Sequence, residues 1–327
     1  MVKITKAQRE LYFKIDAGQT VSYLDSGESL SIVNRKLFSQ KKCYGIEKIE
    51  FDFQPTYTGG VADFDFVRVA VLTAGDTWPV HNAWVKGKAL HTDMQDLVLD
   101  DNPSIKGKWA DFKVFLDSEH RNAVNGAGAP GNLIPLDGIG NPYLRGEWDY
   151  STFVLPQHDV DPVTGEPLAA DECNVHLLGA DLGIVPNLLS AGLVESYALS
   201  RATVQPEDPF VPAGFETSFF NLLTDSGSQE PELALVIEGE NDEPPYDQLN
   251  YPGGAGNGTY PVMTGMTVVN QNHPNGLIDG MIAQCGLLQF IVSASKDGEV
   301  IASPDLFVRV TYAPGMYKGV AAIDMGQ

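Results

Sequence analysis

The sequence has few cysteines and few cations for its length. Only three cysteines occur in 327 residues, and Cys43, Cys173 and Cys285 form no CxxC pair and no Cys/His zinc spacing. We expect three mostly buried thiols in a reducing compartment. Lys and Arg total 21 against 43 Asp and Glu, which gives a formal net charge of −22. This balance disfavours a general nucleic-acid coat, because phosphate contacts need clustered cations.

Long apolar runs are also missing. The most apolar window, residues 281–294, contains two glutamines and is shorter than the roughly 20 residues of a membrane-spanning helix. The first 16 residues carry charges but no apolar core, so they do not read as a secretory signal. The sequence therefore predicts a protein that is made and kept in a cytoplasm.

The sequence contains no motif that identifies a particular catalytic reaction. There is no GxSxG, no P-loop and no HExxH. Residues 126–131 fit GxGxxG formally, but they neither follow a strand nor open a helix. Residues 159–166 resemble a calcium loop, yet the sixth position is Thr164 and the twelfth is Ala170. Calcium binding stays open without an assigned site, and no other cofactor is expected.

Neighbouring ionisable residues offer only weak candidates for acid–base catalysis. Glu119 stands beside His120, and Glu147 lies near Asp149. Glycosidases pair two carboxyl groups in space, whereas adjacent residues of a strand point to opposite faces. We therefore expect no catalytic residues and no enzymatic activity.

The charge is unevenly distributed along the chain. Residues 1–121 contain 16 of the 21 cations, whereas residues 122–327 contain 5 cations and 26 acids. Near the start, Lys3, Lys6, Arg9 and Lys14 face Glu10 alone. This pattern fits a basic arm that contacts an anionic inner surface, either lipid headgroups or genome. It also fits an ordinary solvated terminus, and four cations do not decide between the two.

Short segments rich in β-branched and aromatic residues dominate the chain. Residues 46–57 and 62–72 alternate apolar and polar side chains around a Thr-Gly-Gly turn, which predicts an antiparallel pair of strands. Further strands are expected at residues 11–15, 20–24, 30–33, 82–86, 111–116, 148–155, 173–178, 193–204, 233–238, 260–269, 281–293, 305–312 and 316–322. Helices are few and are expected at residues 91–99 and 215–224.

An acidic, proline-containing stretch at residues 157–172 is the best candidate for a domain boundary. It divides the chain into residues 1–165, with the basic arm, and residues 166–327. About eight strands then fall on each side, which is the strand count of a jelly roll. We therefore expect an all-β protein with two eight-stranded antiparallel jelly rolls side by side and a few short helices in loops.

The order of elements resembles the double jelly-roll major capsid proteins of tailless icosahedral bacteriophages with an internal membrane. The corticovirus-like and Finnlake-virus-like phages are most similar in chain length. The segments that carry the resemblance are GEWDYSTFVLP at 146–156, HPNGLIDGMIAQCGLLQFIVSAS at 273–295 and DLFVRVTY at 305–312.

The resemblance implies a structural protein of the virion, assembled in the host cytoplasm. Three chains would form a pseudo-hexagonal capsomer, with Lys3, Lys6, Arg9 and Lys14 toward the membrane or genome. The implied partners are further copies of the chain, vertex and minor capsid proteins and, as an additional candidate, the internal membrane. No specific nucleic-acid recognition is implied.

Two other functions remain open at this stage. Jelly rolls also occur in glycoside hydrolases and lectins, which use calcium and aromatic platforms. An adhesin or spike component would instead be elongated and bind a receptor.

Overall fold

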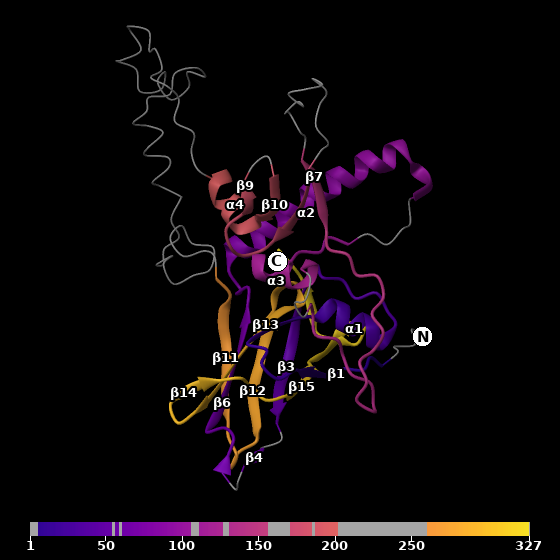
Figure 1. Cartoon of the computed structure of the whole chain (residues 1–327). Helices are drawn as coiled ribbons and strands as arrows, with labels where there is room; N and C mark the ends of the chain where they lie inside the picture. The colour runs from indigo at the N-terminus through magenta and orange to yellow at the C-terminus, as the bar shows by residue number, and fades with distance from the viewer. Residues whose placement is uncertain are drawn as a thin grey trace, which may run out of the picture.

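The computed structural model describes residues 6–53, 56–58, 61–105, 111–126, 131–155, 171–184, 187–201 and 260–326. Its largest part is a sandwich of two antiparallel sheets (Figure 1). The first sheet has the order β1 (Glu10–Ile15), β15 (Leu306–Tyr312), β3 (Lys42–Asp52) and β12 (Asn275–Ala283), with β17 (Ala322–Asp324) also on β3. The second has the order β11 (Val262–Val269), β6 (Phe66–Thr73) and β13 (Leu287–Lys296), and β13 also pairs with β2 (Val21–Asp25) and β14 (Glu299–Ile301).

The eight main strands pair as a hairpin folded over itself. In chain order, the first pairs with the eighth (β1 with β15) and the second with the seventh (β2 with β13). The third pairs with the sixth (β3 with β12) and the fourth with the fifth (β6 with β11). Two more pairings, β15 with β3 and β13 with β6, complete the two sheets. This is the wrapping of a jelly roll.

Alternation along each strand decides which side chains enter the core. In β1, Leu11 and Phe13 are fully buried, whereas Glu10 and Tyr12 face outward. The inner faces of the two sheets meet in one apolar core, where the rings of Phe51 and Phe290 pack edge to face at 6.1 Å. Burial of this core is the main stabilising contribution to the sandwich.

The chain is mostly β with a few helices, as the sequence analysis predicted, but its layout differs from the expected one. The described residues form one jelly roll, and the double jelly roll is not seen in them. Its strands come from both ends of the chain, since β1 lies beside β15 and β3 beside β12. The jelly roll therefore crosses the boundary expected near residue 165. The reason is that strand pairing follows the wrapping of the whole chain, which composition along the sequence does not reveal.

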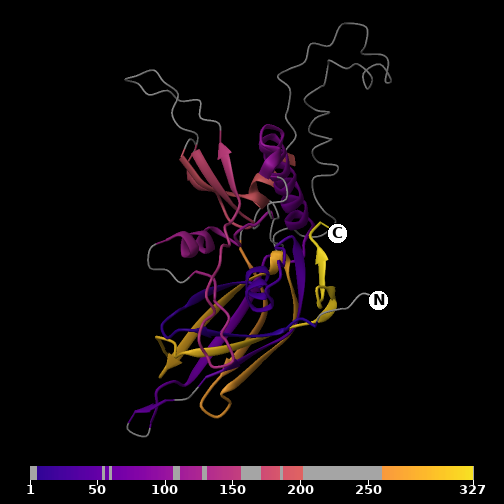
Figure 2. The ribbon, with the colours of Figure 1, turned by 90° about the vertical axis from the view of Figure 1, so that its right-hand side faces the viewer.

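Residues 74–261 stand between β6 and β11 in the chain, and the described part of this insertion extends from one end of the sandwich (Figures 1 and 2). The described part of this insertion contains α2 (Trp78–Asp101), η1 (Pro103–Ile105), α3 (Ser118–Asn125), α4 (Leu193–Arg201) and a sheet of β7 (Thr152–Leu155), β8 (Asp171–His176), β10 (Asn187–Gly192) and β9 (Leu182–Ile184). A second apolar core joins insertion residues such as Trp84 and Leu177 to Leu287 of the sandwich. The β4–β5 hairpin (Tyr57–Thr58, Val61–Ala62) lies at the opposite end.

Helix α2 corrects one expectation and confirms another. The predicted helix at residues 91–99 lies within it, but the strand predicted at 82–86 is wrong. The buried residues Val80, Trp84, Gly87 and His91 recur at helical spacing, and Pro79 occupies the first turn, where its missing N–H costs nothing. A window of five residues was too short to show this period.

A segment of the insertion returns along the side of the jelly roll. We call residues 131–143 the edge strap; Figure 1 shows it running down beside β1. Its backbone donates from Leu133 N to Tyr23 O at 2.7 Å and from Leu136 N to Tyr12 O at 2.6 Å. Leu133 enters the sandwich core. The strap thereby covers the outer edges of β1 and β2, which would otherwise expose unpaired backbone groups.

Other predicted elements differ from the structure in definable ways. Residues 30–33 lie in α1 (Ser26–Asn34) and residues 193–201 in α4, so neither segment is a strand. The segments 46–57 and 62–72 pair only in the short β4–β5 hairpin, where Tyr57 lies opposite Ala62. Their long strands, β3 and β6, belong to different sheets. Residues 281–293 form two strands divided at η3 (Gln284–Gly286). The helix predicted at 215–224 and the strand at 233–238 lie outside the described residues.

We predict that Leu133→Ala destabilises the protein by about 2–3 kcal/mol, because it leaves a cavity where the edge strap enters the core. Ile139→Ala, at a position of the same strap that is 84% exposed, is the matched control and should change the free energy of unfolding by less than about 0.5 kcal/mol. Urea unfolding of both variants measures this. Equal small effects would show that the strap does not stabilise the sandwich.

Candidate functional site

Helix α1 begins on a buried carboxylate. Asp25 is its N-cap, and Asp25 Oδ1 accepts hydrogen bonds from the backbone N–H groups of Gly27 and Glu28. Asp25 Oδ2 accepts from Gln40 Nε2 and from Trp148 Nε1, each at 2.9 Å. Burial, and then the neighbouring Glu28 carboxylate, raise the pKa of Asp25 to about 7. Donors from three separate segments therefore surround one charge that has no access to water.

Glu28 joins the same helix to the insertion. Its side chain is almost fully buried, and it accepts from Arg145 Nε at 2.5 Å and from Arg145 Nη2 at 3.0 Å. Asn132 Nδ2 donates to Glu28 Oε2 at 2.8 Å. The paired guanidinium and the amide together satisfy a buried negative charge.

His120 is held as a neutral imidazole in this network. Its Nδ1 accepts from the backbone N–H of Leu116 at 3.0 Å, so Nε2 carries the proton that it shares with Asn132 Oδ1 at 2.6 Å. Complete burial lowers the pKa of His120 to about 4. Its ring stacks on Tyr23 with a centroid separation of 4.5 Å. Because Asp25, His120 and Asn132 are buried, this part of the network fixes the insertion on the jelly roll rather than offering a substrate site.

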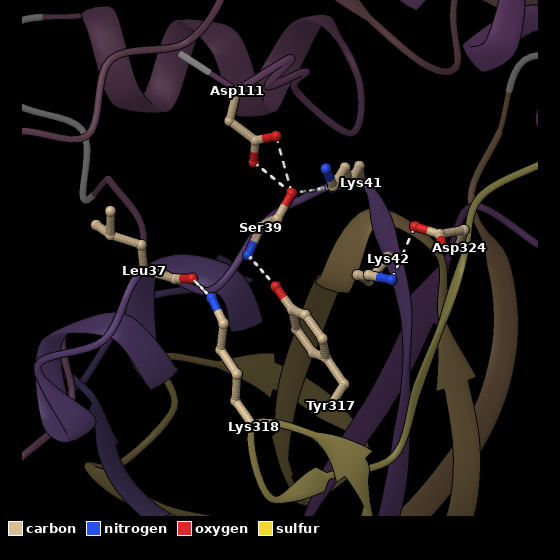
Figure 3. Close-up of a pocket in the computed structure, with 8 residues that line it drawn as sticks. All are labelled: Leu37, Ser39, Lys41, Lys42, Asp111, Tyr317, Lys318 and Asp324. Carbon is tan, nitrogen blue, oxygen red and sulfur yellow. Dashed lines mark hydrogen bonds and ion pairs between the residues drawn. The ribbon is translucent and has the colours of Figure 1, made fainter. Parts of the chain in front are cut away.

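An open pocket lies on the other side of α1, where residues 37–42 meet the C-terminal turn (Figure 3). Its volume is about 520 Å³, and it is lined by Leu37, Ser39, Lys41, Lys42, Asp111, Tyr317, Lys318 and Asp324. We call it the lysine pocket. Ser39 Oγ donates to Asp111, the backbone N–H of Ser39 donates to Tyr317 Oη at 3.0 Å, and Lys318 Nζ donates to Leu37 O. β3, β16 (Pro314–Tyr317), β17 and the segment that follows α1 thus build its walls.

The lysine pocket has more ammonium groups than carboxylates. Lys42 pairs with Asp324 at 2.8 Å. The ammonium groups of Lys42 and Lys318 both lie over the ring of Tyr317, at 4.8 and 5.2 Å from its centroid. Burial first, and then repulsion from neighbouring lysines that include Lys41 and Lys42, lower the pKa of Lys318 despite the attraction of Asp111. In a chain of net charge −22, this local excess of cations is unusual.

The four cations of the predicted arm do not share one place in the structure. Lys3 lies outside the described residues. Arg9 donates to Tyr312 O at 3.0 Å. Lys14 lies within β1, where its ammonium is 2.9 Å from Asp16 and 2.9 Å from Asp305. Lys6 is exposed and precedes the first strand.

The exposed start of the chain runs close to the lysine pocket. The backbone N–H of Gln8 donates to Asn34 Oδ1 at 2.8 Å, and Ala7 packs against Gly319, which follows Lys318. Lys6 therefore directly precedes a residue that contacts the turn carrying Lys318, whereas Lys14 lies at the other end of β1, beside Asp16 and Asp305.

The candidate acid–base pair and a metal site are not assembled in the described part of the chain. Both ring nitrogens of His120 are hydrogen-bonded within the buried network, so its neighbour Glu119 does not form an acid–base pair with it. Within the described ranges, no three His, Cys, Asp or Glu side chains are grouped to hold a metal ion. Residues 159–166 lie outside the described residues. Among the helices that are described, none has both the length and the apolar character needed to cross a membrane.

The sequence carries a local signal for part of each cluster. Asp25 and Glu28 stand three apart, as in a capping box, and predict the start of α1. Residues 35–42 read RKLFSQKK, with four cations and no acid. The distant members, Asp111, Arg145 and Lys318, carry no signal in the sequence that connects them with these segments.

We predict that His120 makes the free energy of unfolding depend on pH. The unfolded imidazole has a pKa near 6.5, so between pH 6.5 and about 4 it binds a proton that the folded state excludes. This contribution is complete above pH 6.5 and is lost as the pH falls. The free energy of unfolding of the wild type should exceed that of His120→Gln by about 2 kcal/mol less at pH 5 than at pH 8.

Urea unfolding of both proteins at these two pH values measures the difference. The comparison with the variant is necessary because Asp25, whose pKa is raised, lowers stability as the pH rises toward 7 and so opposes His120 in the wild-type profile. An advantage that is equal at both pH values would contradict the neutral, buried imidazole.

We predict that Arg145→Met destabilises the protein by about 2 kcal/mol, since it leaves Glu28 buried without its cation. The expected cost is below that of a fully buried pair because the Arg145 side chain is 34% exposed. The double variant Arg145→Met with Glu28→Gln should recover part of this loss in urea unfolding. Additive effects of the two substitutions would argue against coupling between these side chains.

Comparisons of the chain with protein-family models, with curated proteins and with solved structures found no match.

Proposed function

We propose that the protein is a structural coat subunit, the major capsid protein of an icosahedral bacteriophage shell built from trimeric capsomers. The observation that carries this proposal is the complete eight-strand jelly-roll wrapping, an architecture of viral capsid domains. A coat role requires no catalysis, and the buried network at the base of the insertion is a structural device. Lectins share the architecture, so the surface of the jelly roll provides the second argument.

The outward face of the β2–β13–β6–β11 sheet carries a row of apolar side chains. Met266 lies opposite Ala70, Ala70 lies opposite Ile291, and Ile291 lies opposite Val21, so one row crosses four strands. Met263 is opposite Leu72 in the next row. Met266 is 50% and Ile291 is 38% exposed. An exposed apolar face of this kind is typical of a protein–protein interface.

Charge favours a second copy of the chain as the partner of this face. Two molecules of net charge −22 repel each other over most of their surfaces. These two rows contain no charged side chain; Arg68, opposite Val268 and Ser293, is the charged side chain of the adjoining row, and none of the three rows contains a carboxylate. Two copies can therefore approach here without burying like charges.

The outer face of the other sheet has a different character. Arg309 pairs with Glu50 at 2.5 Å, and Lys48 is 3.0 Å from the same carboxylate. Tyr12 and Phe307 are isolated apolar side chains among these charges. This face is suited to solvent, which gives the jelly roll one face for contact and one for exposure.

The insertion bears on how a capsomer of this chain would be composed. A pseudo-hexagonal outline from three chains needs two lobes in each chain. In the double jelly-roll proteins that the sequence resembles, a second sandwich supplies that lobe; in this chain the insertion would supply it. We propose that three jelly rolls and three insertions together form the capsomer.

The test uses Met266→Lys with Ile291→Lys, and Phe307→Lys as the matched control on the other sheet. Light scattering during size exclusion should show the wild type and the control as trimers or larger particles, and the double variant as a monomer with an unchanged melting temperature. At least tenfold weaker association is expected, because charges replace apolar contacts. A wild type that stays monomeric at all concentrations and is stabilised by a glycan would favour the carbohydrate-active alternative.

A further inference from the structure

We propose that the lysine pocket is a binding site for a multivalent phosphate anion of about the size of a diphosphate group. The inference is independent of the coat function, because it rests on the composition and geometry of the pocket alone.

Several cations surround the pocket. Lys41, Lys42 and Lys318 line it. Lys36 is close enough to repel the Lys318 ammonium. In the described part of the chain, the Lys41 ammonium has no carboxylate within ion-pair distance. Ammonium groups that are held together without enough counter-charges are stabilised by a bound multivalent anion.

The second argument is that the two carboxylates in the pocket are already engaged. Both Asp111 oxygens accept from Ser39 Oγ, at 2.8 and 2.7 Å, and Asp111 Oδ2 also accepts from the backbone N–H of Gln40 at 2.9 Å. Asp324 is paired with Lys42. These interactions leave Lys41 and Lys318 as the cations with unused binding capacity, on opposite sides of Ser39 in Figure 3.

The third argument is that the walls of the pocket are fixed. Tyr317 accepts from the backbone of Ser39 and packs its ring edge to face on Phe38 at 5.8 Å. Gly319 has a φ of +102° and packs on Ala7, which holds the turn that carries Lys318. A positioned set of cations loses less entropy on binding than mobile surface lysines do. The volume of about 520 Å³ is in the range of small-molecule sites.

Phosphate chemistry fits better than a single carboxylate. Several ammonium groups that converge from different segments match an anion with multiple charges and several acceptor oxygens. Pyrophosphate has more charge and more acceptor oxygens than phosphate, and phosphate has more than chloride, so we expect the order of affinity pyrophosphate, then phosphate, then chloride.

The experiment is isothermal titration of the full chain with pyrophosphate and with inorganic phosphate at constant ionic strength. The variant Lys41→Gln with Lys318→Gln should bind pyrophosphate at least tenfold more weakly than the wild type. The matched control removes two exposed lysines of α2, Lys86→Gln with Lys88→Gln, and should leave the affinity unchanged. Melting temperatures without ligand verify that all variants fold.

A further variant is expected to increase the affinity for pyrophosphate instead of lowering it. Asp324→Asn removes the partner of Lys42, at a side chain that is 51% exposed, and should tighten pyrophosphate binding severalfold. A short thymidine oligonucleotide, whose phosphodiesters are monoanions, should bind more weakly per phosphate and without dependence on Lys41. The proposal is wrong if the wild type does not bind millimolar pyrophosphate, or if the pocket variant and the α2 control lose the same affinity.

Discussion

The buried carboxylate of Asp25 is the constraint on which the junction of jelly roll and insertion depends. A carboxyl group without access to water must be surrounded by hydrogen-bond partners, and the helix that it caps supplies only two of them. The others come from Gln40, after α1, and from Trp148 and Tyr150 in the insertion. Glu28 extends the same requirement to Arg145 and Asn132. The acids at the start of α1 therefore recruit distant segments, and the insertion is fixed relative to the strands.

Closing the jelly roll creates a second constraint, because the first and last strands must meet. Once β1 and β15 are neighbours, β1 and β2 lie at the same side of the two sheets as edge strands, and the edge strap covers their outer edges with residues of the insertion. The insertion is thus both an additional lobe and part of the wall of the sandwich. This arrangement explains why Leu133, far from either end of the chain, belongs to the same core as Phe13 and Val308.

The two surfaces that we propose as functional have opposite character. The outward face that contains Met266 and Ile291 is apolar and almost free of charge, which suits contact between identical acidic molecules. The lysine pocket is a local excess of cations at the end of the sandwich where the insertion begins. Both differ from the acidic remainder of the chain. Such local departures from average composition are where binding is expected in a protein of high net charge.

The sequence by itself determined the class of the fold and the local elements with a clear period. Alternation in residues 11–15, 62–72 and 305–312 marked real strands, and residues 91–99 marked a real helix. These signals are local, since each depends on side chains within a few positions of one another. Only the tertiary structure decided which strands are neighbours, because every strand of an antiparallel sandwich carries the same alternation and none names its partner.

The same limit applies to the sites. RKLFSQKK at residues 35–42 is visible in the sequence, but Lys318 joins it only through the return of the chain beside β3. The closed network around Asp25 likewise needs residues more than 100 positions apart. Clusters of residues close together in the chain can be recognised from the sequence, whereas contacts between distant segments follow from wrapping the whole chain around one core.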